Sequence, residues 1–459
     1  MTDSSDAAEV VRHLRELVEW ASMVTFDDLP ENVIDKARNV LMDDLGAIIG
    51  GSAEPEPTAV RSRMLASGGA GEATVMASGL PRSDRYTAAL LNGISSCWLE
   101  LDGGYRLALC HGGIYTLPAA LAKAEHLGAH GRDLLLALVT GYEVVARFAR
   151  AWTFPRFGLH PHGTWAAVGS TASVAKLMKL NADLFLDALT AGISTSMASP
   201  YRAAIRGGLV RNVWTGLGAQ AGMFTAEMAD TGIAGLGTAP HDVFTGIFKG
   251  EVAPEVLSKD LGEEFAILGG YHKRYACCQY AHSALDAIFE MDLDAVDVGR
   301  DVQSITVYTH PYGLSLDDRK PRTTLGGKFS MPHAVATGLR HGSAGRLAFG
   351  RDSLADPVVS QLRDKVKLVP YEPIEPWPLD RPARVVLELE DGREIASECR
   401  VAKGDPSFPL DSEDLRKKFT ELIDGVLPVR ASDVIRAVQS LEGRPVTDLV
   451  RVLKGEEVA

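Results

Sequence analysis

Two carboxylates and one histidine stand close together in a glycine-rich segment, residues 99–113. Glu100 and Asp102 come first, and His111 follows with two glycines directly after it. A histidine beside glycines is open to a ligand, and its ordinary pKa of about 6.5 suits proton transfer near neutral pH. The same residues also fit a solvated loop in which the histidine only marks the start of a helix. The segment is therefore a candidate site for acid–base chemistry.

A second pair of histidines stands before an expected helix, in the segment 157–164. One proline separates His160 from His162. Free backbone N–H groups at a helix N-terminus attract anions, so a histidine placed there can meet an anionic ligand. The plainer alternative is that His162 only caps the helix.

Three arginines and a Gly-Gly pair share a short stretch between two apolar helices. Arg202, Arg206 and Arg211 stand there in a chain that is acidic overall. The flat guanidinium group can hold a carboxylate through two parallel hydrogen bonds. The stretch therefore predicts a place for an acidic ligand, and the alternative is a solvated polar face.

Basic, aromatic and thiol side chains come together in the segment 271–282, where we expect a junction between domains. The segment contains Lys273, Tyr275 and the pair Cys277-Cys278. Ligand sites often occupy such junctions. The two cysteines precede a helix, so we expect them to pack rather than to act as nucleophiles.

Signatures of several other functions are absent from the sequence. The histidines at 160 and 162 and the cysteines at 277 and 278 are metal-ligand types, but they lack the paired spacing of a zinc site. No glycine-rich dinucleotide motif follows an expected strand, and neither a P-loop nor a G-x-S-x-G motif occurs. We therefore expect no metal site, no dinucleotide-binding fold and no serine hydrolase.

The composition of the 459 residues is that of an ordinary soluble globular protein. With 47 basic and 60 acidic residues, the net charge of −13 would repel phosphates, so nucleic-acid binding is not expected. The five cysteines, an odd number in a long chain, indicate reduced thiols and favour a cytoplasmic location. The most apolar stretch, 134–139, is far too short to cross a bilayer, so no membrane association is expected.

Helices must position most of these side chains, because helical hydrophobic spacing fills the first half of the chain. In the helix expected at 29–50, apolar residues recur at that spacing until a Gly-Gly pair ends the pattern. The other helices of this half are rich in Ala and Gly, so they can pack closely in a large bundle. They are expected at 84–99, 116–127, 132–150, 164–178, 182–198 and 211–229.

The pattern changes near residue 268, where β-branched residues begin to alternate with polar ones. The expected architecture is mainly α, with a large all-helical domain at 1–267 and 403–459 and a smaller inserted α+β domain at 268–402. Further helices are expected at 411–424 and 431–442. Within the insertion we expect strands at 302–309, 366–369, 384–390 and 393–399, a hairpin turn at Asp391-Gly392, and helices at 279–291 and 329–340.

Eight groups of short motifs, in this order, resemble the MmgE/PrpD family over nearly the whole chain. That family includes 2-methylcitrate dehydratase, cis-aconitate decarboxylase and iminodisuccinate epimerase. No single motif is decisive, and it is their common register that makes the assignment. The motifs are Leu29-Pro30 with Leu45-Gly46, Leu91-Asn92-Gly93, His111-Gly112-Gly113 with Pro118-Ala119-Ala120, Gly141-Tyr142-Glu143-Val144, His160-Pro161, Lys273 to Cys278 with His282, Phe329 to His333, and Lys403-Gly404-Asp405-Pro406.

The resemblance implies a large helical domain, a smaller α+β lid domain and a homodimer. It also implies an active site between the two domains that needs no metal or organic cofactor. By the same resemblance, His111, His160 and Lys273 match the active-site histidines and lysine of the family. Glu100 stands where the family usually has an aspartate.

Three places depart from the family's pattern. The family commonly has an Asp-Asp-Thr run where Asp102 is followed here by Gly103-Gly104, so the threonine hydroxyl has no counterpart. Arg211 stands in place of a lysine and keeps its charge without readily releasing a proton. His333 replaces a tyrosine. These changes leave the substrate and the reaction open, but they preserve a carboxylate-binding cavity.

The reactions of the family share a first step that breaks a bond next to a carboxylate, which requires fixed cations and a base of near-neutral pKa. His111 and His160 are expected to form the acid–base pair. Glu100 is expected to orient a histidine or to protonate a leaving hydroxyl group. The side chains expected to bind the carboxylates and the rest of the substrate are Arg211, Lys273, Arg206, Asp102, His333 and Tyr275.

The primary expectation is a dehydratase that acts on a hydroxylated di- or tricarboxylate similar to 2-methylcitrate. Gly103-Gly104 keeps epimerisation and decarboxylation open as alternatives, because the loss of polar groups near a leaving hydroxyl should impair elimination most. A third alternative is a carboxylate-binding protein without catalysis. Retention of three titratable site residues argues against it. Which histidine accepts the proton stays open.

Overall fold

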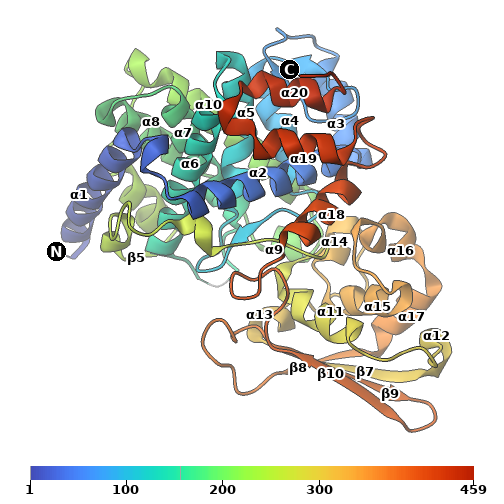
Figure 1. Cartoon of the computed structure of the whole chain (residues 1–459). Helices are drawn as coiled ribbons and strands as arrows, with labels where there is room; N and C mark the ends of the chain where they lie inside the picture. Colours follow the sequence, from blue (N-terminus) through green and yellow to red (C-terminus); the bar gives the residue numbers. More distant parts are fainter. Residues whose placement is uncertain (1, 156, 459) are drawn as a thin grey trace.

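The chain divides into a large helical part and a smaller part that contains a four-stranded sheet (Figure 1). The structure is a computed structural model that describes residues 2–155 and 157–458. Residues 1 and 459, the outer ends of the expected helical domain, lie outside this range. The mainly α architecture is as expected. Among the described residues, no helix is both long enough and apolar enough to cross a membrane.

The helices of the first half agree with the expected ones to within a few residues, with four exceptions, one of which is the short helix α9, not expected from the sequence. α5 begins four residues early, because His111 occupies its N-cap and the glycines after it are already helical. α1 and α3 were not expected, although apolar residues at positions 10, 14, 17, 18 and 21 of α1 follow helical spacing and are buried. The helices of this half are α1 (Thr2–Met23), α2 (Glu31–Ser52), α3 (Pro55–Leu65), α4 (Arg85–Ser96), α5 (Gly112–Leu127), α6 (Gly131–Ala151), α7 (Pro161–Leu177), α8 (Ala182–Ser194), α9 (Arg202–Ile205) and α10 (Val213–Met228).

Small residues let the central helices approach one another closely, as the Ala- and Gly-rich sequence indicates. α10 packs against α7 and α4. Where α10 crosses α4, a β-carbon on Gly93 would lie 2.6 Å from the Cα of Gly216. A side chain at either position would therefore push the two helices apart. This contact positions the first turns of α10, which begins two residues after Arg211.

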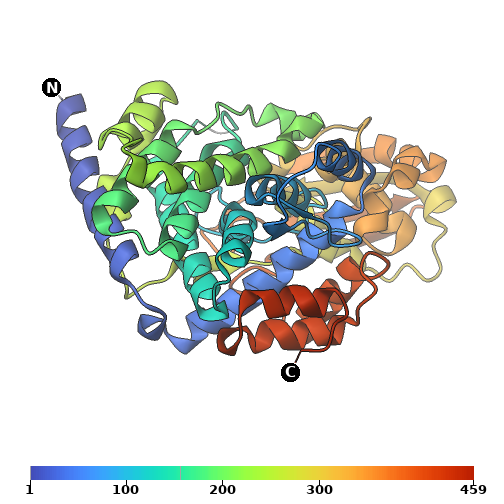
Figure 2. The ribbon, with the colours of Figure 1, turned by 90° about the horizontal axis from the view of Figure 1, so that it is seen from above.

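The C-terminal segment returns to the helical part and lies along α2 (Figure 2). This return agrees with the sequence-based expectation that the last helices rejoin the bundle. Its helices are α18 (Ser412–Ile423), α19 (Ala431–Gln439) and α20 (Val446–Leu453). Figure 2 also shows α1 at one end of the molecule and the smaller part at the other.

The smaller part is built on one sheet with the strand order β10-β9-β7-β8. β9 pairs antiparallel with both β7 and β10, whereas β8 runs parallel to β7. The hairpin between β9 and β10 turns at Gly392, which has a φ of +84°. The strands match their expected ranges to within one residue: β7 (Val302–Thr309), β8 (Val366–Pro370), β9 (Ala383–Leu389) and β10 (Glu394–Cys399).

Helices pack on this sheet and separate most of it from the helical part (Figure 1). Residues of the sheet and of the helices that pack on it form a second buried apolar cluster, distinct from the large cluster of the helical bundle. A few bundle residues, among them Leu99 and Leu422, belong to this second cluster and join the two parts. The helices are α11 (His282–Phe289), α12 (Val298–Asp301), α13 (Pro311–Leu314), α14 (Thr324–Lys328), α15 (Met331–His341), α16 (Arg351–Ala355) and α17 (Pro357–Lys365).

Candidate functional site

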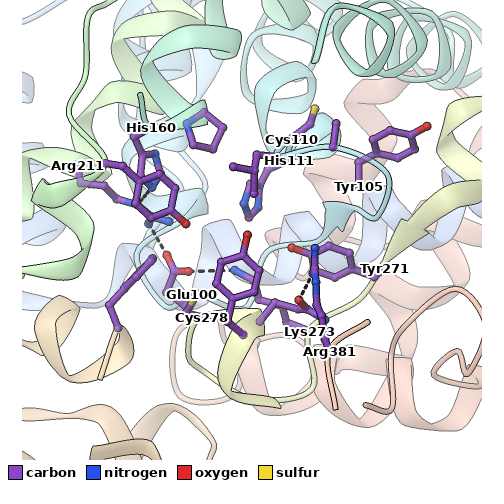
Figure 3. Close-up of a pocket in the computed structure, with 17 residues that line it drawn as sticks. Glu100, Tyr105, Cys110, His111, His160, Arg211, Tyr271, Lys273, Cys278 and Arg381 are labelled. Atoms are coloured by element: carbon purple, nitrogen blue, oxygen red, sulfur yellow. Dashed lines mark hydrogen bonds and ion pairs between the residues drawn. The ribbon is translucent and has the colours of Figure 1, made fainter. Parts of the chain in front are cut away.

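A narrow cavity lies where the helical part meets the smaller part (Figure 3). The free space at its centre is about 40 Å³, and it rises to about 460 Å³ when the gaps between the lining atoms and the open solvent outside the mouth are included. Side chains from segments far apart in the sequence line it. They are Glu100, Tyr105, Ala108, Leu109, Cys110, His111, His160, Pro161, Tyr201, Arg211, Tyr271, Lys273, Cys278, Gln279, Tyr280, Phe329 and Arg381.

Two helix starts and one short strand pair bring the polar residues to this cavity. His111 and His160 are the N-cap residues of α5 and α7. β3 (Gly104–Tyr105) pairs antiparallel with β6 (Gly270–Tyr271), which places the segment after Glu100 next to the segment that carries Lys273. The cavity wall is therefore positioned by backbone elements on both sides.

Four charged side chains form a continuous buried cluster along one wall of the cavity. Glu100 forms ion pairs with Arg211 and, through Oε2 at 3.0 Å, with Lys273 Nζ. Lys273 Nζ also lies 3.3 Å from Asp102 Oδ1. None of these four side chains is more than 1% exposed. The two cations and the two carboxylates balance each other.

The cluster keeps all four groups ionised. Burial by itself raises the pKa of Glu100, but Arg211 and Lys273 outweigh it and hold this pKa below its usual value. Burial likewise raises the pKa of Asp102, and Lys273 together with His111 brings it below the ordinary range. The carboxylates in turn raise the pKa of Lys273 above its usual value against the effect of burial. Lys273 is therefore a fixed cation and not a base.

Asp102 orients His111. The Nδ1 atom of His111 lies 2.6 Å from Asp102 Oδ2 and 3.0 Å from the carbonyl oxygen of Gly103. Both partners are acceptors, so Nδ1 carries the proton and donates it. The Nε2 atom, which is not engaged by these acceptors, is the nitrogen left for a substrate, and Figure 3 shows the ring directed into the cavity. The sequence assigned the orienting role to Glu100, whereas in the structure Asp102 makes this contact.

His160 lies beside the charged cluster and is held by Arg211. Its Nε2 atom accepts a hydrogen bond from Arg211 Nε at 3.2 Å, and its Nδ1 atom is 3.2 Å from the backbone nitrogen of His162. Burial, followed by the nearby positive charge of Arg211, lowers the pKa of His160 well below its ordinary value. The ring is therefore neutral and carries one N–H, so it accepts only one of these two hydrogen bonds at a time.

His162 stands directly behind the two cavity histidines. Its ring centroid is 4.5 Å from that of His160 and 5.0 Å from that of His111. Its Nδ1 atom lies 2.8 Å from the hydroxyl of Tyr115, and its Nε2 atom is buried without a hydrogen-bond partner among residues 2–155 and 157–458. The sequence suggested that His162 caps α7, but His160 is the capping residue.

The structure brings together most of the predicted site residues, but three lie elsewhere. His111, His160, Lys273, Glu100 and Arg211 line the cavity, and Asp102 supports His111 from behind.

Arg206 is half-exposed and lies 3.5 Å from Asp317. The hydroxyl of Tyr275 donates to Asp286, away from the cavity. His333 is fully buried against Phe349, in the core of the smaller part. These positions give the three side chains no contact with the cavity, because the helices and turns that carry them face other surroundings.

Several lining residues were not singled out from the sequence. Tyr271 and Cys278 belong to the segment that was noticed, and burial raises their pKa values to about 12 and about 11. The Cys278 thiol is thus protonated, as expected for a packing cysteine. Tyr201 follows the proline before α9. Arg381 stands in a proline-rich connection, where no spacing or motif marks it.

Within the described part of the chain, no group of three or more His, Cys, Asp or Glu side chains is arranged to hold a metal ion. The charged cluster instead consists of cations and carboxylates in direct contact. Such a cluster neutralises its own charges and holds these groups in fixed positions next to one oriented imidazole.

Known proteins resemble this chain over its whole length. A cis-aconitate decarboxylase-like protein oryM of Aspergillus oryzae is 26% identical, over 99% of both chains. A cis-aconitate decarboxylase of Aspergillus terreus is 24% identical over 90% of this chain and 89% of its own. The same-named protein of Aspergillus terreus strain NIH 2624 is 23% identical over 96% of this chain and 94% of its own.

Two family models match consecutive parts of the sequence. The model of the MmgE/PrpD N-terminal domain matches residues 15–251, and that of the MmgE/PrpD C-terminal domain matches residues 275–442. Together they cover most of the 459 residues. Since both halves match in order, the chain belongs to the MmgE/PrpD family.

Proposed function

We propose that this protein is a lyase that needs no cofactor and dehydrates a hydroxylated di- or tricarboxylate similar to 2-methylcitrate. The observation that carries the proposal is the hydrogen bond between Asp102 and His111, which leaves Nε2 of His111 as an oriented base in the cavity. Membership in the MmgE/PrpD family supports it further.

In the proposed reaction, His111 Nε2 takes a proton from the carbon next to a substrate carboxylate. The C–H bond breaks, its electron pair forms the double bond, and the C–O bond to the hydroxyl group breaks. The hydroxyl group takes up the proton from the imidazolium form of His111 and leaves as water, which regenerates the base. Negative charge builds up on the neighbouring carboxylate, and the fixed positive charge of Lys273 lies beside the base to stabilise it.

Decarboxylation is the second candidate, and the names of the relatives favour it. In this reaction the C–C bond to one carboxylate breaks and carbon dioxide leaves. The electron pair stays on the carbon, which takes a proton from the imidazolium form of His111. The same side chain therefore serves as an acid here and as a base in dehydration.

Epimerisation is favoured by one feature next to the cavity wall, Gly104, which precedes the lining residue Tyr105. A β-carbon on Gly104 would lie 2.3 Å from Tyr271 Oη, so the hydroxyl of Tyr271 occupies the place where the family pattern has a threonine. The loss of the threonine should impair assistance to a leaving hydroxyl more than deprotonation and reprotonation of carbon. A carboxylate-binding protein without catalysis is the remaining alternative.

We further propose that residues 268–402 act as a lid over the cavity and that the protein works as a homodimer in the cytoplasm. The lid is supported by the cavity-lining side chains that this segment contributes, among them Phe329 and Arg381. Light scattering on the purified protein measures the oligomeric mass. A monomeric mass at micromolar concentration would contradict the homodimer.

The function is tested on protein treated with EDTA and supplied with either 2-methylcitrate or cis-aconitate. Dehydration produces an absorbing alkene, decarboxylation releases carbon dioxide, and epimerisation carries solvent deuterium into recovered substrate without alkene. His111→Gln should reduce the active reaction about 10²- to 10⁴-fold. The matched control His126→Gln alters an exposed histidine and should leave the rate unchanged.

Each outcome separates the candidates. Alkene formation supports the dehydratase, and carbon dioxide release or deuterium uptake supports one of the alternatives. If His111→Gln kept full activity, the assignment of the base would be wrong. If none of these compounds reacted but several raised the melting temperature, the binding protein would be favoured.

A further inference from the structure

The cations first assigned to the substrate already have carboxylate partners within the protein. Arg211 holds Glu100, and Lys273 holds both Glu100 and Asp102. Since two positive and two negative charges are buried together, this wall presents no net charge to an incoming polyanion. A substrate with two or three carboxylates therefore needs a further cation, one whose donors are not used by the protein.

Arg381 is the remaining arginine on the cavity wall. It precedes β9 and comes from the smaller part, whereas Glu100, His111 and Arg211 come from the helical part. Figure 3 shows it beside Lys273 and Tyr271, across the cavity from His160 and Arg211. A ligand that touches both walls would thus bridge the two parts of the molecule.

The guanidinium group of Arg381 is positioned by neutral partners. Its Nη1 atom donates to Gln279 Oε1, and its Cζ atom lies 4.9 Å from the ring centroid of Tyr280. A second ring, Tyr312, stacks on Tyr280 at a centroid distance of 4.8 Å and an interplanar angle of 15°. An arginine held flat against an aromatic ring keeps its planar fork in one orientation.

No carboxylate within the described residues forms a hydrogen bond with Arg381. Asp380 forms only a long ion pair with it, in which Asp380 Oδ2 lies 3.7 Å from Arg381 Nε, beyond hydrogen-bond distance. The other oxygen of Asp380 is paired with Arg106. The Nε atom of Arg381 is buried without a hydrogen-bond partner in residues 2–155 and 157–458, and its side chain is 15% exposed. The group is thus held in place while most of its donors remain unused.

We propose that Arg381 binds a substrate carboxylate remote from the reacting carbon and so selects substrates with at least two carboxylates. The inference deepens the proposed function and rests on it, because the substrate must be a polycarboxylate. Arg381, from the smaller part, binds the carboxylate at one end of the substrate. His111, from the helical part, contacts the reacting carbon at the other end. Binding then requires both parts to be in place before proton transfer begins.

The test compares Arg381→Gln and Arg381→Lys with the wild-type protein. The matched control is Arg384→Gln, which removes an exposed arginine three residues further along, on β9. Calorimetry measures the affinity for three probes, which are cis-aconitate, succinate and butyrate. Melting temperatures without ligand show whether each variant is folded, and steady-state kinetics on the reactive substrate separates KM from kcat.

We expect Arg381→Gln to weaken binding of cis-aconitate and succinate about 10- to 100-fold, the loss of one charge-assisted carboxylate contact. Butyrate binding should change less than threefold, because its single carboxylate is held at the reacting end. KM should rise in proportion while kcat changes little. Arg381→Lys keeps the positive charge but loses the planar guanidinium group, so its affinity for cis-aconitate and succinate should lie between those of the wild type and Arg381→Gln. Arg384→Gln should bind them as the wild type does.

Equal affinity of wild type and Arg381→Gln for cis-aconitate and succinate would overturn the assignment of Arg381 alone. If the wild type bound none of the probes, the proposed function and the assignment would fail together. If it bound them with the expected loss in Arg381→Gln but turned over no substrate, the assignment would stand and the proposed function would fail. Should Arg381→Gln not fold, the same comparison with Arg381→Lys decides.

Discussion

At the scale of single residues, the site depends on one histidine whose orientation is set by a charged neighbour. Asp102 fixes the proton of His111 on Nδ1, and Lys273 keeps Asp102 ionised. His160 is chemically different, although both histidines were predicted as an acid–base pair. Because its pKa is lowered and it accepts a hydrogen bond from Arg211, His160 lines the cavity as a neutral hydrogen-bonding group. The structure therefore favours His111 as the proton-transferring residue.

Asp102→Asn tests this orientation. An amide can donate to Nδ1 of His111, which would move the ring proton to Nε2 and remove the lone pair that faces the cavity. We expect kcat to fall about 10²- to 10⁴-fold with a smaller change in KM. Steady-state kinetics measures both, and the exposed carboxylate variant Asp364→Asn is the control. Retention of kcat within tenfold would show that Asp102 does not orient the base.

At the scale of helices and strands, local patterns predicted well and long-range contacts did not. Most of the longer helices and the four strands of the sheet could be located because hydrophobic spacing is a local property of the sequence, although α1 and α3 were missed. The pairing of β3 with β6 involves two residues on each side and joins segments far apart in the chain, so no local signal reveals it. Yet this pairing brings Asp102 to Lys273.

His333 shows the same limit on α15. Its motif suggested a place in the substrate site, but the rotation of α15 directs the ring into the core of the smaller part. There it packs against Phe349 at a centroid distance of 5.7 Å. Arg381 is the opposite case, since it reaches the cavity from a connection without any motif.

His333→Leu should stabilise the protein, most of all in acid. Both ring nitrogens are buried without hydrogen-bond partners among the described residues, and burial lowers the pKa of His333 to about 3. The unfolded chain binds this proton near pH 6.5, so the free energy of unfolding falls as the pH drops from about 6.5 to about 3. Replacement should raise that free energy by about 1 kcal/mol at pH 7 and by about 2 kcal/mol more at pH 5.

Urea unfolding at the two pH values measures these differences. The control His341→Gln changes an exposed histidine of the same helix and should have little effect on stability. Because His333 does not line the cavity, kcat/KM should stay as in the wild type. A raised KM in His333→Leu would instead restore His333 to the substrate site.

At the scale of the whole molecule, the cavity exists only because two parts of the chain meet. Arg106 lies at this junction, almost fully buried, and its Nε atom is 2.6 Å from Asp405 Oδ2. It is also paired with Asp380, the neighbour of Arg381. The family motif around Asp405 could be found in the sequence, but its partner could not, since three hundred residues separate the two charges. The motif therefore predicted the family but not the ion pair between Arg106 and Asp405 that connects the two parts of the molecule.

Asp405→Asn should weaken the ion pair between Arg106 and Asp405 at the junction of the two parts. Removing one charge of a buried pair leaves the other incompletely compensated, although Asp380 still holds Arg106. We expect the free energy of unfolding to fall by about 2–3 kcal/mol. KM should rise because Asp380 adjoins Arg381, whereas kcat should change less. Urea unfolding and kinetics measure these effects against Asp294→Asn, an exposed carboxylate in a loop. An unchanged KM would show that this ion pair does not align the cavity walls.

The close contact between Gly104 and Tyr271 bears on the order in which related sequences can diverge. The threonine that the family pattern implies cannot return to position 104 while the ring of Tyr271 fills its place. A lineage acquires the hydroxyl only together with a shift or a reduction of the side chain at position 271. Paired mutagenesis would therefore find that the effect of a change at position 104 depends on the residue at position 271.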